Sequence, residues 1–293
     1  MNTFSKLLLL VFFITTLQLN AQFTPKTTGI SSFSRFFKSE TYFVLTKNDK
    51  INKALIEAVD SIWTITKAKI INTDTFELMS RDRDKSFVYI KNLKQKGFGK
   101  PVKALCLVNG GYDEMATYIT NTLAYVSLDN EGYEANEEEI IYRLGHLLVQ
   151  LQDVVQIIKD EKIIEKTPEK VRDKMQKYYM GRCKPLQEKT LLVDKRYLNQ
   201  KIISQSEFEK SYKFDIEFVS KDVIAKAIKS KDATAAYLVS ALNLYKINSV
   251  ADCETGKIIY VDFEEENKVT YEFERNFDLD DILQLNGHVR IGK

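Results

Sequence analysis

One order of hydrophobic segments occurs twice along this chain, and this repetition most constrains its fold. Each pass contains three short apolar runs separated by two amphipathic stretches. When the chain is compared with itself at an offset of 148 residues, the two passes align, and Asp74 meets Asp222 and Tyr89 meets Tyr237. Identical residues are few, so the shared order carries the argument. It predicts that one structural unit is used twice.

Each unit is predicted to begin as β-α-β-α-β. In the first copy, residues 41–46 and 86–90 are rich in β-branched and aromatic residues, which is typical of strands. Residues 51–66 place apolar side chains at helical spacing, and Thr73 is expected to cap the second helix. In the second copy, residues 204–207 fit a capping box before the first helix. Parallel strands joined through helices predict an open α/β sheet in each half.

Both halves then change to antiparallel hairpins, because polar turns at 109–111, at 254–257 and near 266–268 separate strand-like runs. The patterns together predict an α/β (α+β mixed) fold, with two related β-α-β-α-β plus antiparallel hairpin units joined by a helical segment. The predicted divisions are a first unit at 38–135, a helical connector at 136–186 and a second unit at 187–290.

The connector carries the strongest helical signal in the chain. Large apolar residues recur in steps of three and four between Ile140 and Ile158, and they form a stripe wider than a two-column coiled-coil seam. We expect this stripe to be buried against the sheets of its own chain, and the alternative is a dimer interface. A second helix is expected to start at Pro168 and to end near Gly181.

Residues 1–21 have the form of a cleavable signal peptide. Lys6 precedes an apolar run at 7–19, and Asn20 and Ala21 follow it. A helix that spans a bilayer needs about 20 apolar residues, so this shorter run predicts cleavage after Ala21 in preference to a membrane anchor. The leader resembles those of exported proteins of the Bacteroidota. That resemblance implies a periplasmic or secreted protein and says nothing about activity.

Charge and hydropathy exclude some classes of protein. The 43 basic residues nearly balance the 41 acidic ones, so no global charge favours nucleic acid as a partner. The lysine-rich stretch at 91–96 is matched by acidic runs at 137–139 and 264–266. No segment after the leader approaches transmembrane length.

The three cysteines are Cys106, Cys183 and Cys253. An oxidising compartment permits one disulfide and a free thiol, or no pair at all. Cys106 lies within an apolar run and is interpreted as a core residue. The absence of a Cys-x-x-Cys pattern argues against a thioredoxin-like redox role and a zinc ribbon.

Catalytic motifs are missing from the sequence: it has no nucleophile elbow, zinc-protease helix, calcium loop or phosphate loop. The two histidines, His146 and His288, each follow a glycine near the end of a copy. No further ligands stand at metal-binding spacing beside them, although a catalytic site assembled from distant residues would leave no local pattern.

These observations favour a noncatalytic envelope protein that binds another envelope protein or a ligand in the cleft between its two halves. The alternative is a hydrolase with a dispersed active site that involves His146 or His288. No catalytic residue is identified, and no cofactor or metal is expected.

Overall fold

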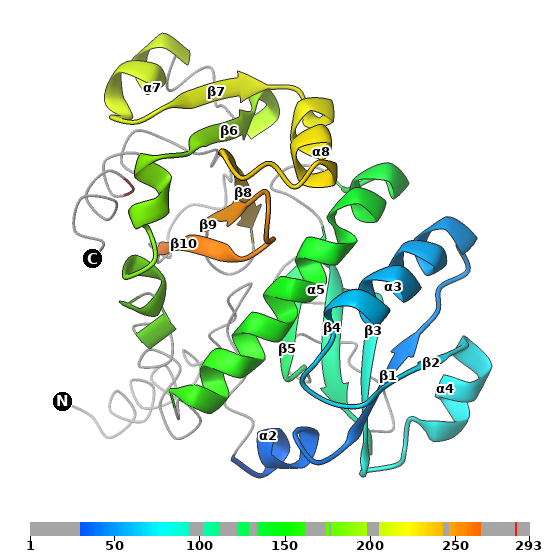
Figure 1. The fold of residues 1–293 in the computed structure, drawn as a ribbon. Helices are drawn as coiled ribbons and strands as arrows, with labels where there is room; N and C mark the ends of the chain where they lie inside the picture. The colour runs from blue at the N-terminus through cyan, green and yellow to red at the C-terminus, as the bar shows by residue number, and fades with distance from the viewer. Residues whose placement is uncertain are drawn as a thin grey trace, which may run out of the picture.

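The computed structural model describes residues 30–93, 102–111, 122–128, 134–161, 174–175, 177–197, 205–242, 246–264 and 285. The predicted leader, Pro168, Ser204 and His288 lie outside these residues. Two five-stranded sheets flank one long helix, α5 (Glu137–Asp160) (Figure 1). None of the helices in the described residues is long and apolar enough to cross a membrane.

The first sheet has the strand order β2-β1-β3-β4-β5. Strand β1 pairs in parallel with β2 and β3, whereas β4 and β5 add antiparallel to β3. In chain order its elements are α2 (Ile30–Phe36), β1 (Glu40–Val44), α3 (Asp49–Ile62), β2 (Ala68–Ile71), α4 (Thr73–Met79), β3 (Lys85–Leu93), β4 (Val102–Asn109) and β5 (Ala124–Ser127).

The second sheet, with the order β10-β9-β8-β6-β7, repeats this plan when it is followed from β7. Strand β6 pairs in parallel with β7 and β8, whereas β9 and β10 add antiparallel to β8. The mixed α/β fold with two related units is therefore confirmed. Its elements are η3 (Lys184–Gln187), β6 (Thr190–Asp194), η4 (Lys195–Tyr197), α7 (Gln205–Ser211), β7 (Ile216–Val219), α8 (Lys221–Lys229), β8 (Ala235–Leu242), β9 (Lys246–Asp252) and β10 (Ile258–Glu264).

Strand register refines the correspondence between the copies. Glu40 pairs with Lys85 as Thr190 pairs with Ala235, so position 40 corresponds to position 190 and position 85 to position 235. In the second strand Ala68 takes the place of Ile216, which keeps the offset found from the sequence. The first and third strands are therefore shifted by two positions relative to that offset. The shift arises because the loops and helices between the strands differ in length: α3 has 14 residues and α7 has 7.

Two local predictions are corrected. Tyr237 takes the register position of Phe87 and not that of Tyr89, as the pairing of these strands requires. The cap of α4 is Asn72, whose side chain accepts a hydrogen bond from the amide of Thr75, so Thr73 is the first helical residue. Asparagine is as good a cap as threonine or better, and the sequence places it one residue earlier.

The apolar stripe of α5 is buried inside the chain, as predicted. Ile140, Leu144, Leu147, Leu151, Val154 and Ile158 are each at most 4% exposed. They belong to one core cluster that contains Phe43 and Leu105 of the first sheet together with Leu192 and Tyr237 of the second. Helix α5 is thus the centre of a shared core, and the seam between the two halves is packed with side chains. The positions of the unit boundaries remain predictions.

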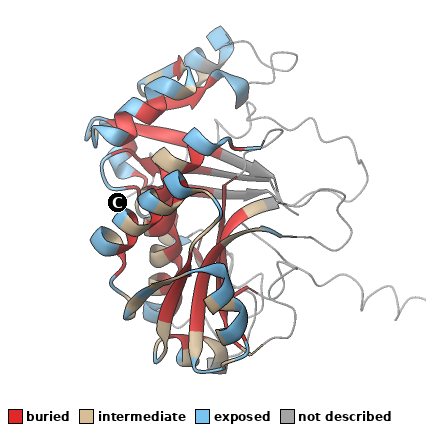
Figure 2. Ribbon diagram, turned by 90° about the vertical axis from the view of Figure 1, so that its right-hand side faces the viewer, coloured by how far each residue is buried: buried red, intermediate tan, exposed pale blue. Residues whose placement is uncertain are grey.

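The two units present unlike faces to α5. In the first unit the face under α3 meets α5, whereas in the second the face under α8 does (Figure 1). Tyr42 and its register counterpart Leu192 show this directly, because Tyr42 packs in a separate cluster with Phe76 of α4 and Leu192 lies in the shared core. Figure 2 shows the buried strands with exposed residues on the outer helices.

Candidate functional site

His146 lies on α5 and faces the second unit. Its Nδ1 is 3.1 Å from the hydroxyl oxygen of Tyr237 on β8, and the two rings stack with centroids 5.8 Å apart. The side chain is buried, and burial lowers the pKa of His146 to about 4, with the charge of Arg143 acting in the same direction and that of Asp252 against it. His146 is therefore neutral at pH 7.

A tight turn of the second unit closes over His146. Gly256 has a φ of +72°, and a Cβ built on it would lie 2.7 to 2.9 Å from three atoms of His146, including its Cα. The turn is held by Asp252, whose Oδ1 accepts hydrogen bonds from the amides of Glu254 and Thr255. Lys189 pairs with the same carboxylate at 2.9 Å. His146 is thus enclosed by packing, and it is not among the lining residues of the hollows beside residues 181–188, α8 and α2.

The three cysteines are all free and buried. Burial raises the pKa of Cys183 and Cys253 to about 12 and also raises the pKa of Cys106. A thiol with such a pKa is protonated at neutral pH, and it is a poor nucleophile because the thiolate is the reactive form. None of the three is a hydrogen-bond partner of His146. The structure therefore does not bring a cysteine and His146 together as a nucleophile and base.

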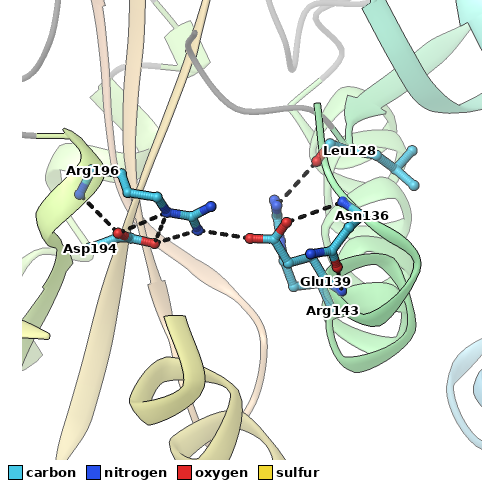
Figure 3. Close-up of polar contacts among 6 residues, drawn as sticks. All are labelled: Leu128, Asn136, Glu139, Arg143, Asp194 and Arg196. Carbon is cyan, nitrogen blue, oxygen red and sulfur yellow. Dashed lines mark hydrogen bonds and ion pairs between the residues drawn. The ribbon is translucent and has the colours of Figure 1, made fainter. Parts of the chain in front are cut away.

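A charged network joins the units at the carboxyl end of β6 (Figure 3). Arg196 donates from Nη2 to Oδ2 of Asp194 at 2.6 Å and to Oε1 of Glu139 at 2.7 Å. Both carboxylates are buried, whereas the Arg196 side chain is 40% exposed. Glu139 also closes the capping box of α5 with Asn136, and Arg143 one turn later donates to the carbonyl of Leu128.

The carboxyl ends of strands are where open α/β sheets commonly bind ligands. Here one guanidinium pairs with two buried carboxylates, one on α5 and one at the end of β6, so the network fixes the second sheet against the start of α5. The sequence showed only an acidic helix start at 137–139. No local pattern pointed to Arg196, which reaches Glu139 across 57 residues of chain.

A hollow of about 630 Å³ lies where the segment at 181–188 runs beside the start of β10 (Figure 1). Its lining combines cationic, acidic and apolar side chains: Gly181, Arg182, Lys184, Pro185, Glu188, Thr255, Lys257, Ile258 and Ile259. Two smaller hollows lie beside α8 and beside α2. None of these residues belongs to a local sequence pattern typical of a site, because the lining comes from two segments, 181–188 and 255–259, that are distant in the chain.

Neither a cluster of metal ligands among the described residues nor a match to a known protein assigns a function to this chain. Among the described residues, no three His, Cys, Asp or Glu side chains gather where they could hold a metal ion. No protein-family model, curated protein or solved structure matches this chain.

Proposed function

We propose that this chain is an exported, noncatalytic binding protein of the bacterial envelope, periplasmic or secreted, that takes its ligand in the hollow between residues 181–188 and β10. The leader supports export through its apolar run at 7–19 and the small residue Ala21. The hollow supports binding because its volume falls within the range of about 300–1,000 Å³ that small-molecule sites occupy.

The observation that carries the proposal is the composition of that hollow. Lys184 and Lys257 stand on different segments of its lining, and the exposed Pro185 supplies apolar surface. Such a mixture of a few polar groups with apolar surface is what ligand sites present. The cleft between the halves, where binding was expected from sequence, is the seam that α5 fills.

Two measurements test this function. The chain that starts at Gln22 is purified from the envelope of its host, and small molecules released on denaturation are compared by mass spectrometry with those from Lys184→Glu/Lys257→Glu. We expect compounds that are enriched on the native chain and lost from the variant. A panel of ester, amide, glycoside and phosphate substrates supplies the second measurement. Turnover that His146→Gln abolishes without unfolding the protein would replace binding with the hydrolase alternative.

A further inference from the structure

The two lysines of the hollow have no ion-pair partner in the described part of the chain. Both are exposed, and they come from segments that are distant in sequence, Lys184 from η3 and Lys257 from the turn before β10. Folding therefore places two cations on the lining of one hollow. Cations that line one hollow favour the binding of an anion there.

A third cation, Arg182, is held in position by its neighbours. Its guanidinium carbon lies 4.0 Å from the ring centroid of Tyr178, and its Nη1 is 3.5 Å from Oδ2 of Asp153 on α5. A cation held by an aromatic face and a carboxylate loses less conformational entropy when it meets a ligand. Arg182 is thus preorganised at the hollow.

The charge balance of the site favours an anion. Arg182, Lys184 and Lys257 supply three positive charges, and the carboxylates of Glu188 in the lining and Asp153 behind Arg182 supply two negative ones. Burial raises the pKa of Asp153, with the charges of Arg182 and Lys257 opposing the rise.

We propose that the hollow binds a small organic anion, with a carboxylate or phosphate group held by Arg182, Lys184 and Lys257 and an apolar body against Pro185 and Ile259. The inference deepens the proposed function and rests on it. Carboxylate and phosphate share the oxyanion chemistry that guanidinium and ammonium groups recognise. The aliphatic surface supplies the rest of the binding energy.

The test uses the chain from Gln22 and two defined probes, phenyl phosphate and benzoate, with benzyl alcohol as the neutral analogue. Isothermal titration should show saturable binding of at least one anion and none of the alcohol. The tighter anion identifies the headgroup. Lys184→Gln/Lys257→Gln should weaken binding by about tenfold, since the two exposed charged contacts that are lost are together worth about 1.4 kcal/mol. The matched control is Lys47→Gln/Lys53→Gln, which removes two exposed charges in the first unit and should leave affinity within about twofold.

A second readout does not depend on the variants. In the native chain, amide resonances at 182–188 and 255–259 should shift on titration with the anion. Three results would overturn the inference. They are resonance shifts confined to other regions, equal anion affinity of the Lys184/Lys257 variant and the Lys47/Lys53 control, and no saturable binding of either anion at millimolar concentration. Those results would leave an uncharged or protein ligand open to the proposed function, which is contradicted separately by His146-dependent turnover.

Discussion

Substituting Gly256 by alanine is the sharpest probe of how the second unit meets α5. The residue has a φ of +72°, where an L side chain costs about 1–2 kcal/mol. The new Cβ would also lie 2.7 Å from Cδ2, 2.8 Å from Cγ and 2.9 Å from Cα of His146. Overpacking of this kind typically costs about 1–3 kcal/mol. Together the two effects predict that Gly256→Ala lowers the free energy of unfolding by about 2–5 kcal/mol.

The nature of the clashing atoms sharpens this prediction. The imidazole could rotate away, but Cα belongs to the backbone of a 24-residue helix packed in the shared core. His146→Ala in the Gly256→Ala background should therefore recover only part of the loss. The assay is urea unfolding of the chain from Gln22, followed by circular dichroism, with equal slopes required before midpoints are compared.

Gly145→Ala is the matched control, because it adds the same methyl group on α5 at the residue next to His146. Its Cβ would meet only Cδ1 of Ile62, at an ordinary 3.5 Å. Replacing a mid-helix glycine should stabilise the protein by about 0.5–1 kcal/mol. If Gly256→Ala proved as harmless as Gly145→Ala, the turn could not lie against α5, and the packing of the two units described above would be wrong.

Four further predictions concern the core, the charges and export. Leu147→Ala and Leu151→Ala should each cost about 2–5 kcal/mol in urea unfolding, because both side chains are at most 1% exposed; neutral effects would contradict their burial. The pKa of His146 is about 4 in the folded protein and about 6.5 in the unfolded chain, so the unfolded chain binds the proton first as pH falls. The shifted pKa therefore contributes about 3 kcal/mol to the free energy of unfolding above pH 6.5, and this contribution is lost as pH falls from 6.5 to 4. His146→Gln should flatten that part of the profile of stability against pH, and an unchanged profile would show that the pKa of His146 is not lowered. Arg196→Ala should lower the free energy of unfolding by about 1–3 kcal/mol, which is less than the loss of a fully buried ion pair because the arginine is partly exposed. A neutral result would show that the network does not fix the second sheet against α5. Mass spectrometry of the protein from its host should find the N-terminus at or near Gln22, and an intact Met1 in the membrane fraction would exclude cleavage.

Local periodicity predicted the elements of this fold well. The alternation and helical spacing of apolar residues depend on near neighbours in the chain, so the strand runs at 41–46 and 86–90 and the stripe of α5 agree with the structure. The repeated order of these elements also predicted two sheets with the same strand order. The exact offset was beyond this reasoning, because an amphipathic pattern does not fix the ends of a helix to within a residue or two.

The surroundings of His146 could not be predicted in the same way. On a helix it points about 100° away from Leu147, outside the direction of the apolar stripe. A second packed surface covers that direction, because Gly256, which follows much later in the chain, closes against the ring. The same limit applies to Arg196 and to the hollow at Lys184 and Lys257, where contacts between distant segments create the environment.

The unlike packing of the two units also explains why their sequences share so few identical residues. Helices α4 and α8 occupy the same place in the repeat, yet α8 buries four residues, three of them in the shared core, and α4 buries none. At the offset of 148, exposed Glu77 takes the place of buried Ala225. Equivalent positions therefore meet different surroundings, so burial favours different side chains at each while the order of elements is kept.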